Sequence, residues 1–410
     1  MAAADIELNV NPVQTGQAHD ALGLTTLFGL LAAFTLSTLD GGSVQQRVVS
    51  VIFLSLSAVY LSVPFTQRLT LNVPCVCLLL MTCYGLAQTF WFPQKIFYNG
   101  LTGVLFWFTA AMITIMATQV FQKARAADWF RNAVIVFGSV VCLLDLLEQA
   151  SHTAKYYWLI PSKYHAVFGP FAYWNNFAQF VELVLPLTLW HGLIRKRSIE
   201  IPYLVMAALQ IGAVVASGSR AGTALVLVEL LALVALAYWR RRDAKLLFGA
   251  ALAIGLTFVF IYAAGFDVVI DKLQQNDQLA VRRNINLSSL DMIREHPFTG
   301  WGLETYVPVY RMFARYDDGT FVNRAHNDWL QWTAEGGIFF AGLMLIVFVW
   351  SIKPAIRSVW GIGLIAICLH ALVDYPFARL GVCGWYFALI AMLATYKRET
   401  RPHSSKGAAA

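Results

Sequence analysis

Long apolar runs recur along almost the whole chain, and short polar connections separate them. Crossing about 30 Å of hydrocarbon as a helix takes about 20 apolar residues, and most of these runs approach that length. Because lipid offers the backbone no hydrogen-bond partner, such a run has to be helical. The pattern predicts an all-α membrane protein of about 12 transmembrane helices. The expected spans are 22–39, 48–65, 73–92, 100–121, 131–150, 171–194, 201–218, 221–239, 246–265, 329–350, 357–375 and 380–396.

One polar segment interrupts this pattern between the ninth and tenth runs, and we expect a long loop over residues 266–328. The rest divides simply into an N-terminal tail over 1–20, a single transmembrane domain over 21–396 and a C-terminal tail over 397–410. The first twenty residues carry acidic side chains and no basic region, which argues against a cleaved signal peptide.

The distribution of charge predicts the orientation. The chain is 58% hydrophobic and 13% charged, and cytoplasmic connections of membrane proteins carry an excess of Lys and Arg. Seventeen basic residues lie in the C-terminal tail and in one alternate set of connections, against six in the other set of short connections. Those six are Arg47, Lys95, Lys155, Lys163, Arg220 and Arg379. The counts place both termini in the cytoplasm and the segment 266–328 outside.

The sequence lacks the motifs of several classes of function. The net charge is +7, and in a membrane protein an excess of Lys and Arg usually lies in cytoplasmic loops near anionic lipid, so we expect no nucleic-acid partner. All six cysteines lie in apolar stretches and favour core positions over a disulfide framework or a zinc site. The sequence has no phosphate-binding Gly-rich loop followed by Lys and no cluster of metal ligands. We therefore expect no cofactor and no metal, and energy from an activated substrate or a gradient.

The long loop is rich in arginine. Its basic residues are Lys272, Arg282, Arg283, Arg294, Arg311, Arg315 and Arg324. The planar guanidinium group matches phosphate oxygens in a bidentate way, so an outer cavity lined by arginines would suit a diphosphate. The alternative is that these arginines meet phospholipid head groups at the membrane surface.

Arg220 lies in a short outer turn between two apolar runs, Ser217-Gly218-Ser219-Arg220-Ala221-Gly222. Small neighbours leave room for a bound group, and the amides at the start of the next helix favour anions. An interfacial arginine whose charged end reaches water remains the alternative.

His326 stands at the entrance of the tenth run, where Asn327 or Asp328 can cap the helix and Gln331 and Glu335 continue a polar face. A neutral imidazole at the membrane surface can accept a proton from an attacking hydroxyl. A structural histidine is the alternative.

The connection before the sixth run is rich in aromatic and amide residues. Residues 169–176 read Gly-Pro-Phe-Ala-Tyr-Trp-Asn-Asn and suggest a broken helix entrance with a flat surface for a sugar. An interfacial aromatic belt explains Tyr173 and Trp174 equally well. Glu182, Glu229 and Asp374 lie at or inside apolar runs, where acids usually face the bundle interior, and their partners stay unassigned.

Four of these motifs together resemble a known family. They are residues 169–178, 217–222, 296–304 (His-Pro-Phe-Thr-Gly-Trp-Gly-Leu-Glu), and 326–331 (His-Asn-Asp-Trp-Leu-Gln) with the Glu-Gly-Gly that follows at 335–337. A fifth, weaker match is His-Ala-Leu-Val-Asp-Tyr at 370–375. In this order on the outer face, they resemble the O-antigen ligase and polymerase superfamily of bacterial inner-membrane glycosyltransferases.

The resemblance implies that the transmembrane domain transfers a glycan from undecaprenyl diphosphate to an acceptor hydroxyl on the periplasmic side, without a metal. It makes His326 the catalytic base. It implies that Arg220 binds the diphosphate together with either Arg282 or Arg283, and the choice between these two neighbours stays open. Polar residues expected to support the substrate or the site are Asn176, Asn327, Asp328, Gln331, Glu335 and Glu304.

The resemblance leaves the acceptor open. The compact chain with one long outer loop favours a ligase that uses lipid A core, whereas a polymerase of lipid-linked repeats or a protein O-oligosaccharyltransferase would use similar motifs. The alternative from another class is a membrane transporter for an anionic solute. A transporter would place broken helices at mid-membrane in repeated halves, whereas here the polar residues gather at the outer surface.

Overall fold

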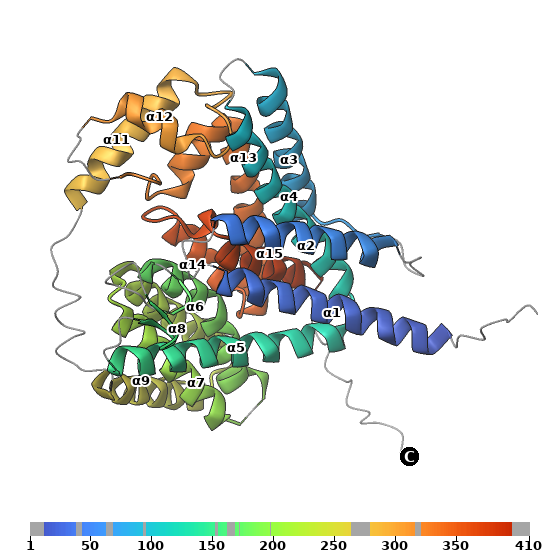
Figure 1. Ribbon diagram of the computed structural model, residues 1–410. Helices are drawn as coiled ribbons and strands as arrows, with labels where there is room; N and C mark the ends of the chain where they lie inside the picture. Colours follow the sequence, from blue (N-terminus) through green and yellow to red (C-terminus); the bar gives the residue numbers. More distant parts are fainter. Residues whose placement is uncertain are drawn as a thin grey trace, which may run out of the picture.

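The structure is a computed structural model that describes residues 12–37, 43–62, 69–92, 96–151, 155–161, 169–171, 173–196, 198–263, 279–315 and 321–395. Lys163 and Lys272, the C-terminal tail and the first part of the expected long loop lie outside these ranges. Within them the regular secondary structure is helical apart from a hairpin of two short strands, β1 (Lys155–Tyr156) with β2 (Ile160–Pro161). The all-α expectation is therefore confirmed for the described residues (Figure 1).

The helices follow the apolar runs in order. The first half of the chain holds α1 (Pro12–Leu36), α2 (Ser43–Ser62), α3 (Val73–Trp91), α4 (Phe97–Val120), α5 (Ala124–Ala150), α6 (Trp174–Leu189) and a π-helical turn (Trp190–Arg195). The second half holds α7 (Ile201–Ser217), α8 (Arg220–Arg241), α9 (Lys245–Ala263), α11 (Leu279–Glu295), α12 (Tyr306–Phe313), α13 (Asp328–Ser358), α14 (Ile362–His370), a 3₁₀ turn (Pro376–Ala378) and α15 (Leu380–Thr395).

Seven of the described helices are long and apolar enough to cross a membrane: α3, α4, α5, α6 with its π-helical continuation, α8, α9 and α13. Shorter apolar helices cover Asp20–Leu36, Ile201–Ser217 and Leu380–Thr395. The protein is thus a multi-pass membrane protein, while the expected number of about 12 spans is not confirmed. The helix α1 also begins at Pro12, inside the segment 1–20 that we expected to be a tail.

The expected span 357–375 is wrong in length, because α14 covers only Ile362–His370. The residues before it belong to the end of α13, which runs on to Ser358. After His370 the chain leaves the helix, and the carbonyl groups of Ala371 and Asp374 accept hydrogen bonds from the amide of Asp328 instead. Pro376 follows and has no amide to donate. A non-helical segment, residues 371–379, therefore lies against the start of α13.

The apolar core gathers around α15. The ring of Trp385 packs against Phe28 of α1, Phe130 and Phe137 of α5 and Phe180 of α6, with ring centroids 5.7 to 6.0 Å apart. Its indole nitrogen also donates a hydrogen bond across to α1. Figure 1 shows α15 surrounded by these helices. The core thus connects the first half of the chain to its last helix, far away in sequence.

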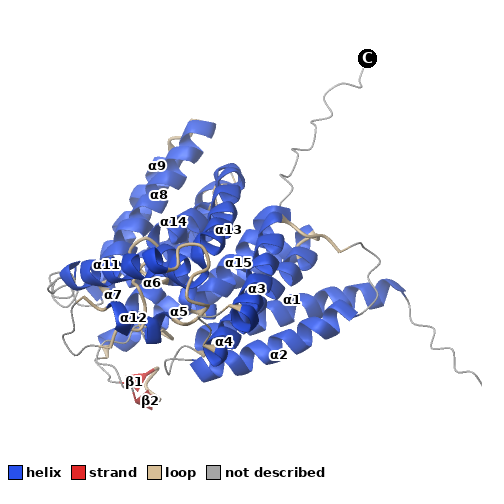
Figure 2. Ribbon diagram, turned by 90° about the horizontal axis from the view of Figure 1, so that it is seen from above, coloured by secondary structure: helices blue, strands red, loops and turns tan. Residues whose placement is uncertain are grey.

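The expected long loop 266–328 contains two helices, α11 and α12. A small second core with Ile285, Met292, Tyr306 and Tyr310 holds them together and against the first turns of α13. Figure 1 shows α11 and α12 as a group beside α13, and Figure 2 shows the helices from above in blue with the β1–β2 hairpin in red. Part of the long polar segment is therefore a folded cap over the entrance of α13.

The helix α13 is kinked at Gly337, which has φ +67°. The carbonyl groups of Ala334 and Glu335 accept hydrogen bonds from the amides of Trp301 and Gly302, at 2.9 and 2.8 Å. The amide of Ile338 donates to the carbonyl of Pro297, at 2.9 Å. These bonds replace the helical ones that the kink removes. Two of the sequence motifs, 296–304 and 335–337, are therefore in direct contact.

Candidate active site

The first turns of α6 and α8 lie side by side. A Cβ atom on Gly222 would come within 2.4 Å of the Cβ of Ala178, so only glycine allows this approach. Gly218 closes α7 with φ +80°, and the Ser219 side chain accepts a hydrogen bond from the amide of Gly222 to cap α8. Arg220, the first residue of α8 and an exposed side chain, is thereby placed at the same end of the bundle as the start of α6.

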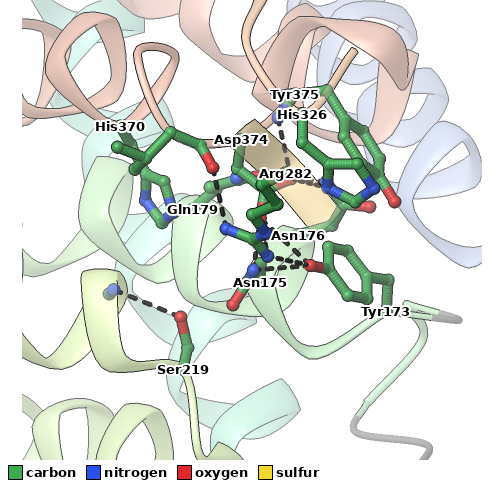
Figure 3. A network of polar contacts seen from close by, with 12 residues as sticks. Tyr173, Asn175, Asn176, Gln179, Ser219, Arg282, His326, His370, Asp374 and Tyr375 are labelled. Atoms are coloured by element: carbon green, nitrogen blue, oxygen red, sulfur yellow. Dashed lines mark hydrogen bonds and ion pairs between the residues drawn. The ribbon is translucent and has the colours of Figure 1, made fainter. Parts of the chain in front are cut away.

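Arg282 comes from the first turn of α11 and reaches the segment 371–379 (Figure 3). Its Nη1 donates to the carbonyl oxygen of Val373 at 2.9 Å, and its Nη2 donates to the hydroxyl of Tyr173 at 3.1 Å. The carboxylate of Asp374 lies 3.9 Å away. The side chain remains 27% exposed, so its guanidinium group is fixed by the protein and still open to a ligand.

Asp374 is the centre of this network and is fully buried. It accepts hydrogen bonds from the Asn175 side chain, from the Tyr173 hydroxyl at 3.2 Å and from the amide of Tyr375 at 3.0 Å. Burial by itself would raise the pKa of Asp374, but His326 and other positive groups outweigh it and hold the pKa below its usual range. The site therefore contains a buried negative charge.

His326 lies beside that charge, with its Nδ1 3.5 Å from the nearer Asp374 oxygen. This distance exceeds that of a good hydrogen bond, and Nδ1 is buried with no hydrogen-bond partner in the part of the chain that the structure describes. The rings of Tyr173 and Tyr375 stack 5.5 Å apart, and both meet the imidazole edge-on. The imidazole is thus held between a carboxylate and two tyrosines while its side chain stays 19% exposed.

Two of the expected supporting residues fix the backbone around His326. The Asn327 side chain caps α13 by accepting a hydrogen bond from the amide of Leu330, at 3.1 Å. The Asp328 carboxylate is buried and accepts from the amide of Phe377, at 2.8 Å. Together with the amide of Asp328, these bonds tie the entrance of α13 to the segment that carries Asp374.

The other expected polar residues hold the loop before α12. Glu335 is buried and accepts hydrogen bonds from the amides of Glu304 and Tyr306, at 3.0 and 3.1 Å. Gln331 donates to Glu335 and accepts from the amide of Ala325, at 3.2 and 3.1 Å. The Glu304 carboxylate itself forms an ion pair with Arg324, at 3.2 Å. These side chains position the chain around His326, and none of these contacts is to the imidazole.

Two of the expected site residues, Asn176 and Arg283, lie outside the hydrogen-bond network that contains Arg282. Asn176 is buried in the first turn of α6 and donates to the Gln179 side chain at 2.7 Å (Figure 3). Arg283 is exposed, whereas Arg282 is partly buried. Since adjacent residues point about 100° apart around a helix, only one of the two arginines can face Asp374.

Four members of the network were not selected as site residues from the sequence: Tyr173, Asn175, Asp374 and Tyr375. The sequence did carry a signal for Asp374, because an acid at the end of an apolar run needs a partner. Its partners in the structure are Asn175 of α6, Arg282 of α11 and His326, which lies two residues before α13. Glu182 also has a partner, because its carboxylate lies 2.7 Å from Nδ1 of the buried His370.

Comparison with known proteins relates part of the chain to a family. Residues 205–347 match the family model described as O-antigen ligase. Neither the curated proteins nor the solved structures gave a match. The matched range contains Arg220, Arg282 and His326, whereas Tyr173 and Asp374 lie outside it. Residues 205–347 are thus similar to an O-antigen ligase domain, and the protein is a multi-pass membrane glycosyltransferase of that type.

Proposed function

We propose that the protein transfers a glycan from undecaprenyl diphosphate to a hydroxyl group of lipid A core, at the periplasmic face of a bacterial inner membrane. The proposal includes the arrangement expected from the sequence, with about 12 spans and both termini in the cytoplasm. One observation carries it. A buried imidazole nitrogen without a hydrogen-bond partner among the described residues lies 3.5 Å from the Asp374 carboxylate, in the network that contains Arg282.

In this mechanism His326 acts as the general base. If Nδ1 carries the proton and faces Asp374, Nε2 is the free base that accepts the proton of the acceptor hydroxyl. The hydroxyl oxygen attacks the anomeric carbon, and the bond to the diphosphate oxygen breaks with its electron pair staying on the diphosphate. Attack opposite the leaving group inverts the anomeric carbon. The Asp374 carboxylate stabilises the imidazolium that forms.

The arginines stabilise the leaving diphosphate. Arg282 uses two of its N–H donors on Val373 and Tyr173, which orients the group and leaves other N–H donors for phosphate oxygens. Arg220 adds a second charge at the first turn of α8, where the backbone amides also favour an anion. We assign the role that the sequence left between Arg282 and Arg283 to Arg282, because Arg283 points away from the network.

The position of the network favours transfer over transport. The polar side chains come from the first turns of α6, α8 and α11, from the residue two before α13 and from the segment 371–379. A transporter would instead collect such groups at broken helices near the middle of the membrane.

The test uses purified protein, undecaprenyl-diphosphate-linked glycan and lipid A core, with wild type, His326→Ala and Arg220→Lys. General-base catalysis contributes about 10²- to 10⁴-fold, so we expect His326→Ala to lose at least about 100-fold in kcat. Arg220→Lys keeps the charge but loses the planar fork, and we expect weaker donor binding. Arg294→Gln is the matched control, because that side chain is 73% exposed and pairs only with Asp291 in the described structure.

Full transfer by His326→Ala would remove the proposed base, provided that the variant melts at the wild-type temperature. The choice of acceptor is tested separately. If product forms from the lipid-linked glycan alone by joining two of its repeats, the protein is a polymerase, and the lipid A core part of the proposal is wrong.

A further inference from the structure

A pocket outside the His326 network contains none of the residues in the proposed transfer mechanism. Its lining comes from the first turns of α2, from α4, from the loop around Glu304 and from the residues before α15. Three of its lining residues are arginines, Arg47, Arg324 and Arg379. Among the described residues of the lining Glu304 is the only acid, so positive charge is in excess.

The arginines are held in place by neighbouring groups. Arg324 is paired with Glu304 at 3.2 Å and is 20% exposed, and burial together with this carboxylate fixes its position. Arg47 donates from Nη1 to the Tyr98 hydroxyl at 3.0 Å. The pocket therefore has a positive wall whose guanidinium groups are ordered before any ligand arrives, which reduces the entropy lost on binding.

Gln46 gives independent evidence for a ligand. Its side chain is 7% exposed and lines the pocket, and its amide nitrogen Nε2 has no hydrogen-bond partner among the residues that the structure describes. A buried donor without a partner costs free energy, because the group has lost its water and gained nothing. An oxygen atom of a bound molecule in the pocket would satisfy this donor.

Two arginines of the pocket come from the same chain segments as the site around His326. Arg324 precedes the histidine by two residues, and Arg379 follows Tyr375 by four. Burial and Asp374 raise the pKa of the Tyr375 hydroxyl above its usual value, while Arg379, Arg324 and Arg282 act in the opposite direction. The arginines of the pocket therefore lie within electrostatic reach of the ring that packs on His326.

We propose that this pocket binds a phosphate or carboxylate substituent carried by the acceptor saccharide, and so places the acceptor hydroxyl at His326. Guanidinium groups and an unpartnered amide donor all require acceptor oxygens, which such an anion supplies. The inference rests on the proposed function, because it assumes that the donor diphosphate uses Arg282 and Arg220. It commits to an anion on the saccharide, as opposed to the phosphate of a membrane phospholipid.

A binding experiment tests the pocket without requiring transfer. The full chain in phosphatidylcholine nanodiscs is titrated with glucose 6-phosphate and with glucose by calorimetry. We expect binding of the phosphorylated sugar only, with a dissociation constant that rises about tenfold in Arg379→Gln and about fivefold in Gln46→Leu. Gln46→Leu should fold normally, because the amide nitrogen it removes has no hydrogen-bond partner within the described part of the chain. Arg294→Gln, at an exposed site elsewhere, should bind like wild type.

The variant His326→Ala separates this inference from the proposed function, because it should bind glucose 6-phosphate like wild type although it lacks the proposed base. Equal binding of glucose, or unchanged affinity in both Arg379→Gln and Gln46→Leu, would overturn the pocket assignment whatever the protein's activity. Loss of binding when phosphatidylglycerol replaces phosphatidylcholine would assign the pocket to a phospholipid head group and also overturn it.

A transfer assay then tests the role of the pocket. Arg379→Gln should raise KM for a phosphorylated acceptor by about tenfold and leave KM for the lipid-linked donor unchanged. Removal of the phosphates from the acceptor should cost wild type the same factor and cost Arg379→Gln nothing further. A loss in kcat alone, equal for both acceptors, would contradict an acceptor-binding role.

Discussion

The strongest test of the His326 network is the replacement Asp374→Asn. It removes one negative charge and changes the volume of the side chain very little. Asp374 is fully buried, and its nearer oxygen lies 3.5 Å from Nδ1 of His326. If the carboxylate stabilises the imidazolium formed during transfer, the substitution should lower kcat and leave the position of the imidazole nearly unchanged.

The size of the effect follows from this distance. Two unit charges 3.5 Å apart interact by about 5 kcal/mol at an effective dielectric constant of about 20, and by about 1 kcal/mol in bulk water. The His326 side chain is 19% exposed, so the value lies between these limits. An effect of about 2 to 3 kcal/mol corresponds to a loss of about 30- to 150-fold in kcat.

The assay is steady-state transfer at saturating donor and acceptor, together with the melting temperature of each variant. Asn at position 374 would place an amide near the Asn175 side chain, which donates to the carboxylate in wild type, so some loss of stability is expected. Asp374→Glu keeps the charge and should retain more activity than Asp374→Asn. If Asp374→Asn melts like wild type and keeps kcat within about threefold, the carboxylate does not stabilise the imidazolium.

Two further comparisons use neighbouring positions as controls. Arg282→Lys should raise KM for the lipid-linked donor by about tenfold or more, because all three donors of Lys sit on one nitrogen and cannot replace the planar fork that spans Val373, Tyr173 and a phosphate. Arg283→Lys should change KM by less than about twofold, and the reverse order would show that the register is wrong. Gly337→Ala should destabilise the protein by about 1 to 3 kcal/mol, since φ is +67° and the added Cβ would lie 2.1 Å from the carbonyl oxygen of Phe298. Gly342→Ala, with nothing within 4 Å of the added Cβ, should melt at or above the wild-type temperature, and equal melting temperatures for the two variants would contradict the kink.

The boundaries of several helices could be predicted from local chemistry. The turn between α7 and α8 is an example. The sequence places a break at Ser217 to Gly222, and the structure ends α7 at Gly218 with positive φ and caps α8 with Ser219. Glycine favours that conformation and serine favours that cap for reasons that act within a few residues. Such breaks need no knowledge of the rest of the fold.

The kink of α13 could not be predicted in the same way. The apolar pattern runs through Gly337 without interruption, and the helical bonds lost there are replaced by the segment 296–302, more than 30 residues away. Periodicity shows which face of a helix is apolar but not which distant segment packs on it. The motif 296–304 carries part of the family resemblance, yet its structural role as a partner for the broken helix depends on the tertiary fold.

The candidate site could be predicted only in part, because some of its features are local and others depend on tertiary contacts. Asn327 as a helix cap fixed the place of His326 at the entrance of α13, because capping is local. The choice between Arg282 and Arg283 needed the register of α11, which lies in a polar segment without a clear apolar stripe. The role of Asp374 needed the end of α14 at His370, and the apolar run gave no sign that the helix stops there.

The backbone around His326 indicates that the site is rigid. The residue has φ +51°, a left-handed conformation that costs a non-glycine residue about 1 to 3 kcal/mol. The structure maintains it through bonds on both sides, from the amide of Ala325 to Gln331 and from the amide of Asp328 to the carbonyl groups of Ala371 and Asp374. A base held in this way cannot follow its substrates, so both substrates must be brought to it. Arginines fixed on both the α11 side and the pocket side of the histidine provide that placement, which is why donor and acceptor binding should respond to different arginine substitutions.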